Sequence, residues 1–215
     1  MNEINKTKDA FEQALFSLLE TKNYHDITIN EICAVAKKTK MTFYHYYKDK
    51  DHLLDQASIH LINNEYEAEY YKIVSRITDL EEIEYESVYA TYEWVARHYN
   101  QIQNLIYKGE TFPLEVFKNA LLGNYSRYMT ELIHSLGYDI PSDFFSIFCF
   151  EGLYGSSLYY GQQLKNSKNK RKVKEEIKKV CRLLAKAVMS VVKEYQAINQ
   201  QTEIETEEDE SVSEE

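Results

Sequence analysis

Hydrophobic residues recur along this chain at intervals of three and four positions, the spacing of one face of an α-helix. The alternating pattern of a half-buried strand is absent. A first helix is expected from about residue 5 to 21, and its apolar face is formed by Ala10, Phe11, Ala14, Leu15, Leu18 and Leu19. Thr28 and Glu31 have the spacing of a capping box, which predicts a second helix of about two turns. Thr39 is a suitable N-cap for a third short helix that ends near Tyr46.

The same period continues through the rest of the chain. A fourth helix is expected to begin between residues 49 and 51 and to reach about residue 76. Further helices are expected at about 82–98, 101–108, 114–136, 142–164 and 170–196. The first glycine is Gly109 and the first proline is Pro113, so no helix breaker interrupts the N-terminal half. The pattern therefore predicts an all-α protein.

Three regions follow from this pattern. Residues 1–50 form a three-helix unit with a helix-turn-helix, and residues 51–200 form a larger helical domain. Residues 201–215 are acidic and lack aromatic side chains, so we expect a disordered tail that buries too little apolar surface to fold.

The net charge of −10 is unevenly distributed. Residues 203–215 carry eight acids and no base, and the other 202 residues together carry only −2. Residues 35–50 contain five lysines against Asp49 alone, a local charge of +4. Because counterion release depends on the charges that meet phosphates, this segment suits DNA despite the acidic total.

The three cysteines and the absence of long apolar runs narrow the class of protein further. Cys33, Cys149 and Cys181 are widely spaced, which favours reduced thiols over a disulfide framework or a zinc site. No segment approaches the roughly 20 apolar residues of a membrane span, and the N-terminus has no signal-peptide pattern. We therefore expect a cytoplasmic protein.

Two short helices joined by a tight turn, preceded by a longer amphipathic helix, are typical of a DNA-binding helix-turn-helix. The second of the pair enters the major groove and its N-terminal side chains reach base edges. Thr39, Lys40 and Thr42 provide polar groups at its start, while Phe43 and Tyr47 provide an apolar back face. A lysine-rich turn with tyrosines can also be an ordinary solvated surface, but the cap, the two-turn helix and the polar start together favour DNA binding.

The segment from Ile32 to Leu53 resembles the signature of the TetR family of transcriptional regulators. Its order and spacing, ICAVAKKTKMTFYHYYKDKDHL, match that signature without a gap, as does the upstream Thr28-x-x-Glu31-Ile32. The resemblance covers roughly residues 10 to 54. It implies an N-terminal DNA-binding domain, a C-terminal domain for ligand binding and dimerisation, and repression as the default mode of regulation.

Carried over by position, the resemblance implies DNA contacts from Thr28, Lys38, Thr39, Lys40, Thr42, Tyr44, His45, Tyr46 and Lys50. Tyr44 and Lys50 are expected to hold the phosphate backbone, and Thr39, Lys40, Thr42 and His45 to read bases. Lys37 stands where the family has a turn glycine, so a positive φ there would cost about 1 kcal/mol. Lys38 replaces a common aliphatic residue and Met41 a common glycine, which leaves the turn geometry and the operator sequence open.

Nineteen tyrosines suit a cavity that holds a small molecule, because tyrosine combines apolar area with a hydroxyl. They can equally be core and surface aromatics, and the resemblance is what implies an effector pocket. The candidate ligand-binding residues are Tyr92, Tyr107, Tyr125, Tyr128, Phe148, Glu151 and Tyr154. Glu151, in an otherwise apolar segment, is the main candidate for a polar contact with the unknown small-molecule effector.

Small residues on the expected helix 142–164, namely Gly152, Gly155, Ser156 and Gly161, permit close approach of another helix. Together with the apolar stripe of the last helix they favour a homodimer through four helices, two from each subunit. Packing within one subunit is the alternative. A dimer would place two recognition helices on a palindromic operator.

Other classes of function fit less well. No phosphate loop, nucleotide fingerprint, nucleophile elbow or zinc spacing occurs, so we expect no enzyme, no catalytic residues, no cofactor and no metal. Glu131 and His134 form the only Glu-x-x-His, whereas a di-iron bundle needs two. A transcriptional activator of the same fold and a helical protein-interaction module without specific DNA binding remain the alternatives.

Overall fold

A computed structural model of the chain describes residues 3–106, 112–135, 137 and 142–213, with side chains for 4–106, 112–135, 137 and 146–201. The described residues are helical and contain no strand, which confirms the all-α class. The α-helices are α1 (Glu3–Leu19), α2 (Ile29–Ala36), α3 (Lys40–Tyr46), α4 (Lys50–Leu61), α5 (Ala68–Val74), α6 (Leu80–Arg97), α7 (Tyr99–Gln103), α8 (Phe112–Ser135), α9 (Ser142–Asn166) and α10 (Lys170–Ser213).

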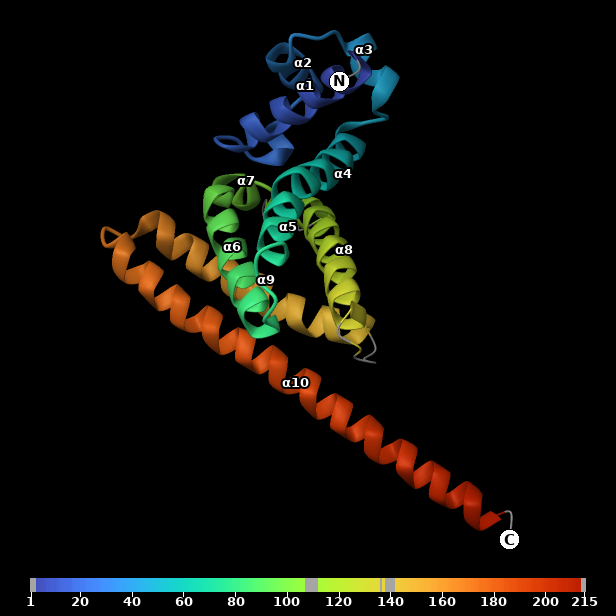
Figure 1. Ribbon diagram of the computed structural model, residues 1–215. Helices are drawn as coiled ribbons and strands as arrows, with labels where there is room; N and C mark the ends of the chain where they lie inside the picture. Colours follow the sequence, from blue (N-terminus) through green and yellow to red (C-terminus); the bar gives the residue numbers. More distant parts are fainter. Residues whose placement is uncertain (1–2, 107–111, 136, 138–141, 214–215) are drawn as a thin grey trace.

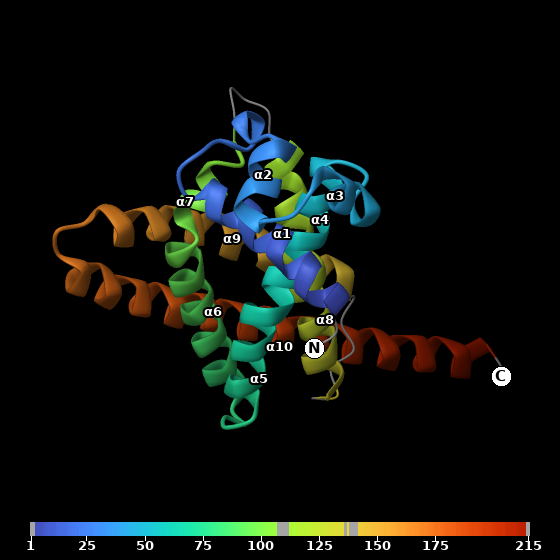
Figure 2. The same cartoon turned by 90° about the horizontal axis from the view of Figure 1, so that it is seen from above.

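The helices α1, α2 and α3 gather at one end of the molecule, and α4 leads from them into a larger helical body (Figure 1). In that body α6 packs against both α9 and α10, and α8 packs against α4 and α9. Because α4 contacts α1 as well as α8, one helix is shared by the two parts. The view from above shows α9 and α10 joined by a short hairpin and α10 extending beyond the body (Figure 2). The division of the chain at residue 50 stays a prediction.

The expected fourth helix is present but is not uniform. Its α-helical turns are interrupted by a π-helical segment, Ile62–Glu67, between α4 and α5. Glu65 lies in this segment, and its carboxylate accepts a hydrogen bond of 3.1 Å from Trp94 Nε1 and contacts His98 Nε2 at 2.9 Å. The wider π-helical turn thus coincides with a polar contact to α6. The spacing of apolar residues in the sequence did not predict this contact.

The last helix is longer than the apolar stripe predicted. The backbone of α10 is helical to Ser213, so it includes most of the segment 201–215 that we expected to be disordered. Extending an existing helix fixes one residue for each added hydrogen bond, and the Gln- and Glu-rich sequence does not oppose this. The side chains beyond Gln201 lie outside the described residues, and the disorder expected of the tail stays a prediction.

Candidate nucleic-acid interface and internal cavity

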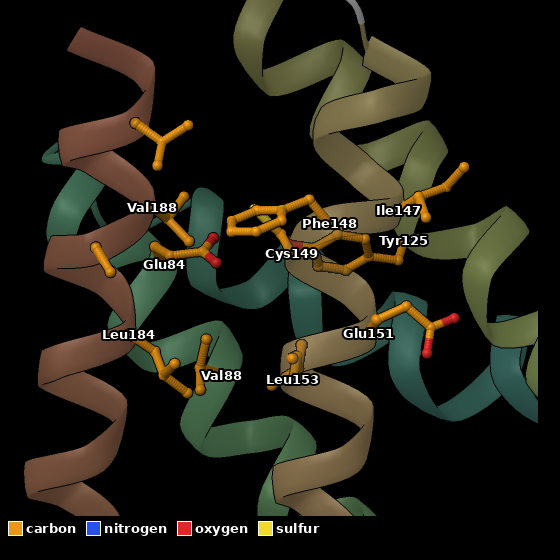
Figure 3. A pocket seen from close by; sticks show the side chains of 13 residues that line it. Glu84, Val88, Tyr125, Ile147, Phe148, Cys149, Glu151, Leu153, Leu184 and Val188 are labelled. Carbon is orange, nitrogen blue, oxygen red and sulfur yellow. The ribbon is translucent and has the colours of Figure 1, made fainter. Parts of the chain in front are cut away.

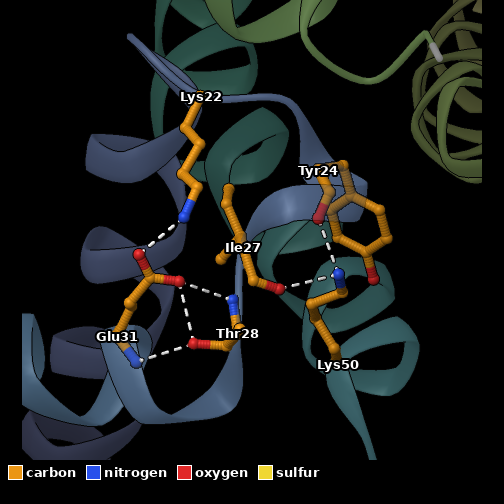
Figure 4. A network of polar contacts seen from close by, with 6 residues as sticks. All are labelled: Lys22, Tyr24, Ile27, Thr28, Glu31 and Lys50. Carbon is orange, nitrogen blue, oxygen red and sulfur yellow. Dashed lines mark hydrogen bonds and ion pairs between the residues drawn. The ribbon is translucent and has the colours of Figure 1, made fainter.

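The start of α2 is fixed by the capping box that the sequence predicted. Glu31 N donates to Thr28 Oγ1 at 3.3 Å, and the backbone N–H of Thr28 donates to Glu31 Oε2 at 2.9 Å. Lys22 Nζ also donates to Glu31 Oε1 at 2.6 Å (Figure 4). The bonds from Lys22 and Thr28 lower the pKa of the Glu31 carboxyl to about 2. The carboxylate therefore stays ionised at neutral pH and helps to hold the helix start.

The turn between α2 and α3 contains the positive φ that its position suggested. Lys37 has φ 55° and ψ 43°, and it is the one non-glycine residue with positive φ in the described part of the chain. Its N–H bonds to Ala34 O at 3.2 Å, and the N–H of Lys38 bonds to Cys33 O at 3.0 Å. Both hydrogen bonds close the end of α2. Lys37 therefore adopts a left-handed conformation that would be less strained for glycine.

Helix α3 has the two-sided character expected of a recognition helix. Thr39 is its N-cap and accepts a hydrogen bond of 3.1 Å from Thr42 N. Phe43 is fully buried, and its ring meets that of Phe11 in α1 edge-on at 5.4 Å. Tyr44, the next residue, keeps 56% of its surface exposed. The back of α3 is therefore anchored in the core, which leaves the other face to solvent.

A buried carboxylate, which the sequence analysis missed, ties α3 to two other helices. Glu12 in α1 is 7% exposed, accepts a hydrogen bond of 3.0 Å from the Tyr47 hydroxyl and contacts His60 Nδ1 in α4 at 2.9 Å. Glu12 precedes the buried Phe16 and Leu19 by four and seven positions. That spacing puts it on the apolar face of α1 and was the available signal.

The nine predicted DNA-contacting residues differ in exposure. Lys38 and Lys40 are exposed, as are Thr28, Thr39, Tyr44 and His45. Thr42, Tyr46 and Lys50 are half-buried, and the Thr42 hydroxyl hydrogen-bonds that of Thr39 at 2.9 Å. The exposed members all come from the two helix starts, the turn and α3, so the fold gathers them in one region.

Lys50 is placed differently from the backbone contact expected of it. Its ammonium donates to the carbonyl oxygens of Tyr24 at 2.6 Å and Ile27 at 2.9 Å, and lies 4.1 Å from the centre of the Tyr24 ring (Figure 4). Burial lowers the pKa of this ammonium. Two of its three donors are thus used within the protein, and Lys50 holds the loop before α2 against the start of α4.

A cavity of about 690 Å³ opens between α6, α8, α9 and α10 (Figure 3). Of the predicted ligand-binding residues, Tyr125, Phe148 and Glu151 line it. Tyr154 lines a much smaller adjoining space, of about 20 Å³, together with Tyr125. Glu151 contacts Lys118 Nζ at 2.8 Å, and Figure 3 shows its carboxylate pointing away from α10. The best polar candidate from the sequence therefore already has a partner at the cavity edge.

The remaining predicted ligand-binding residues lie elsewhere. The buried Tyr92 donates its hydroxyl hydrogen bond to Ser156 Oγ at 2.7 Å, and Tyr128 stacks on Tyr70 with ring centres 4.3 Å apart. Neither lines the large cavity. Tyr107 lies outside the described residues.

Sequence reasoning missed Glu84, the most unusual residue of the cavity. Its side chain is only 4% exposed, lines the cavity and receives no hydrogen bond or ion pair from any described residue. Burial raises the pKa of its carboxyl to about 7. Glu84 precedes the buried Val88 and Tyr92 by four and eight positions, so the helical period placed it on the inner face of α6.

The helix-turn-helix and the helical body together have the architecture of one-component DNA-binding regulators with a separate helical domain. Residues 13–57 match the family model described as "Bacterial regulatory proteins, tetR family". The resemblance to the TetR family is thereby confirmed, and the chain has the fold of TetR-family transcriptional regulators. No curated protein matches the sequence.

Solved structures share the fold of more than four fifths of the chain. A TetR-family transcriptional regulator from Syntrophomonas wolfei aligns with a TM-score of 0.63 at 18% identity, covering 84% of this chain and 95% of the other. The fatty acid degradation regulator FadR from Bacillus halodurans aligns with a TM-score of 0.60 at 19% identity, covering 83% of this chain and 94% of the other. FadR from Bacillus subtilis, solved in complex with stearoyl-CoA, aligns with a TM-score of 0.58 at 15% identity, covering 82% of this chain and 97% of the other.

At these identities the likeness concerns the fold. No helix among the described residues is long and apolar enough to cross a membrane.

Proposed function

We propose that the protein is a ligand-responsive homodimeric repressor that acts in the cytoplasm by binding a palindromic DNA operator. The observation that carries this proposal is the two-sided recognition helix α3, with Phe43 buried behind it and Tyr44 exposed in front. The exposed lysines of the turn supply charge for phosphates, and Thr39, Lys40, Thr42 and His45 supply hydrogen-bonding groups for base edges. We propose no catalytic role for any residue.

The outer faces of α9 and α10 support the homodimer. Large apolar side chains are exposed on both helices, among them Ile147 and Tyr159 on α9 and Leu183 and Val191 on α10. Exposed apolar groups clustered on two adjacent helices are typical of a surface that another chain covers.

The small residues of α9 divide between the two kinds of packing. A side chain at Gly161 would meet Val95 Cγ1 of α6 at 3.1 Å, so Gly161 serves packing within the subunit. At Gly152 and Gly155 a side chain would meet nothing within 4 Å. These two positions leave room for the close approach of a partner helix in a four-helix interface.

Polar contacts between α7 and α1 support communication between the two parts of the chain. Gln101 Nε2 donates to Phe16 O at 3.2 Å, and Asn104 Nδ2 donates to Leu19 O at 2.8 Å. The backbone N–H of Tyr24 donates to Asn104 O at 2.8 Å. A ligand that moved α6 would therefore strain the attachment of α1 to the body. By thermodynamic linkage, bound DNA would change the affinity for the ligand by the same factor as the ligand changes the affinity for DNA.

The ligand-responsive part of the proposal also draws on the fold neighbours. One of them is a regulator in complex with stearoyl-CoA, a ligand with a long apolar chain. A cavity of about 690 Å³ with mainly apolar walls fits a small molecule of drug-like size. An activator of the same fold is the second candidate, and transcription from a promoter that carries the operator distinguishes the two.

Selection from a random duplex library tests the proposal. The full-length protein is expected to enrich one palindromic sequence, and the ratio of protein chains to duplex is expected to be two or a multiple of two. Tyr44→Ala is expected to weaken binding to the enriched duplex while leaving the helical circular dichroism unchanged. Enrichment of no sequence would remove the proposed function.

A further inference from the structure

We propose that the cavity between α6, α8, α9 and α10 binds an apolar organic cation whose positive charge is neutralised by the Glu84 carboxylate. The inference rests on the proposed function in that it names the class of effector. It is carried by the combination of an apolar cavity and a buried carboxyl without a partner.

The Glu84 carboxyl points into the cavity. In Figure 3 it lies between Val188 of α10 and Phe148 of α9, facing the space between these helices. The α10 side of that space is formed by Leu184, Ala187, Val188 and Val191. These aliphatic side chains offer neither a hydrogen-bond donor nor a positive charge to the carboxylate.

A buried carboxylate without a partner is costly, so its position calls for a compensating group. Lys118 contacts Glu151 at 2.8 Å and forms no ion pair with Glu84. A ligand cation would provide what the protein lacks, and the surrounding apolar walls would strengthen the attraction by excluding water. An anion of the same shape would meet repulsion from the ionised carboxylate and, among the described residues that line the cavity, no compensating positive charge.

The hydroxyl of Tyr125 adds a second polar group to the cavity. It is buried and lies near both the Glu84 carboxyl and the Cys149 thiol. Its oxygen can accept a hydrogen bond from an ammonium N–H, and its ring presents an aromatic surface to a cation. The polar side of the cavity therefore accepts hydrogen bonds and attracts positive charge.

The cavity edge also fits the proposed dimer. Ile147 and Val191 line the cavity and belong to the exposed apolar faces of α9 and α10. A second subunit covering those faces would close the cavity further from water. An effector there would touch α6, α9 and α10 together, and could alter how the two subunits meet.

Two probes of nearly the same shape and opposite charge test the proposal: tetraphenylphosphonium and tetraphenylborate. Isothermal titration of the full-length protein, without DNA, measures both. Tetraphenylphosphonium is expected to bind at one site per chain, and tetraphenylborate at least about tenfold more weakly. Glu84→Gln is expected to weaken phosphonium binding about tenfold or more. The matched variant Glu81→Gln, on the same helix but outside the cavity lining, is expected to change it less than about twofold.

The pH dependence of phosphonium binding provides a second reading that needs no variant. Affinity is expected to rise between pH 6 and 8, since binding the cation requires the ionised Glu84 carboxylate. The other titratable groups near Glu84 are Tyr66, Tyr70, Tyr125 and Cys149, whose pKa values are all raised by burial. They remain neutral over this range, and the lining of α10 contributes no titratable group.

Equal binding of the two probes, binding of neither, or unchanged phosphonium binding in Glu84→Gln would overturn the cation site. The titration contains no DNA, so its outcome is separate from that of the duplex selection. Phosphonium binding without an enriched duplex would retain the cation site and remove the regulator. An enriched duplex without selective phosphonium binding would retain the regulator and remove the cation site.

Discussion

The Tyr47 hydroxyl at the end of α3 donates a hydrogen bond of 3.0 Å to the Glu12 carboxylate in α1. The same carboxylate contacts His60 in α4 at 2.9 Å. One buried acid thus joins the helix that we propose reads DNA to the helix that enters the body. The orientation of α3 relative to α4 depends on this contact as well as on the packing of Phe43 against Phe11.

Tyr47→Phe removes this hydrogen bond and keeps the ring in the core. The free energy of unfolding is expected to fall by about 1 kcal/mol, because Glu12 loses one of its partners. Urea unfolding followed by circular dichroism measures the change. Tyr46→Phe is the matched control, since the Tyr46 hydroxyl forms no hydrogen bond within the part of the chain that the structure describes, and its loss is expected to have little effect. Equal losses in both variants would show that the bond to Glu12 does not contribute.

Lys37→Gly relieves the left-handed conformation at the turn. Lys37 has φ 55°, which costs a side-chain-bearing residue about 1 kcal/mol relative to glycine. The variant is expected to unfold at a higher urea concentration. The gain is partly offset because glycine gives the unfolded chain more conformational entropy to lose on folding. Lys38→Gly removes the same charge at a residue without positive φ, and it is expected to lower stability. A loss of stability in Lys37→Gly would contradict the strained turn.

Lys50→Met and Lys40→Met distinguish an internal lysine from a DNA-facing one. Lys50→Met removes the ammonium that bonds to the carbonyl of Ile27 and leaves the carbonyl of Tyr24 with the Ile27 N–H as its donor, so the free energy of unfolding is expected to fall by about 1 to 3 kcal/mol. Lys40 is exposed, and Lys40→Met is expected to change stability by less than about 0.5 kcal/mol. Thermal unfolding of the two variants side by side measures this contrast, and unchanged stability in Lys50→Met would contradict the internal role.

Glu84 makes stability depend on pH. Its pKa is about 7 in the folded protein and about 4.5 for the ordinary side chain, so the folded state binds the proton more tightly. Stability is therefore expected to fall as the pH rises from about 4.5 to 7, by up to about 3 kcal/mol, and this contribution levels off above pH 7.

Glu84→Gln is expected to remove that fall and to be more stable than the parent protein at pH 7.5. Urea unfolding at pH 5.0, 6.0 and 7.5 measures both proteins, with Glu81→Gln on the same helix as control. Parallel curves for the parent and Glu84→Gln would show that this carboxyl titrates normally.

Local features were predictable because the residues that make them lie close together in sequence. The capping box of Thr28 and Glu31 and the N-cap at Thr39 need only the neighbouring residues, and both occur where expected. The buried face of α3 followed from the spacing of Phe43 and Tyr47, which the structure places in the core. The all-α class followed from the same period along the whole chain.

The missed features depend on partners far apart in sequence. Glu12 meets Tyr47 35 residues away and His60 48 residues away, and its burial follows only when three helices pack. The residue type and position of Lys50 predicted a phosphate contact. In the fold its ammonium donates instead to carbonyls 26 and 23 residues earlier in the chain. Glu151 was chosen as the polar candidate because its neighbours in sequence are apolar. Glu84, which the sequence analysis did not consider, is the carboxyl that the fold buries in the cavity.

The salt dependence of duplex binding tests the central claim, that α3 and the lysines beside it read DNA, most directly. Fluorescence anisotropy of the enriched duplex at a series of salt concentrations compares the parent protein with Lys38→Met, in the turn before α3, and with Lys172→Met, an exposed lysine of α10. The slope of log K against log salt is expected to become shallower by about 1 for each Lys38 whose phosphate contact is lost in Lys38→Met. It is expected to stay unchanged in Lys172→Met. Identical slopes in all three proteins would contradict the assignment of α3 as the DNA-reading helix.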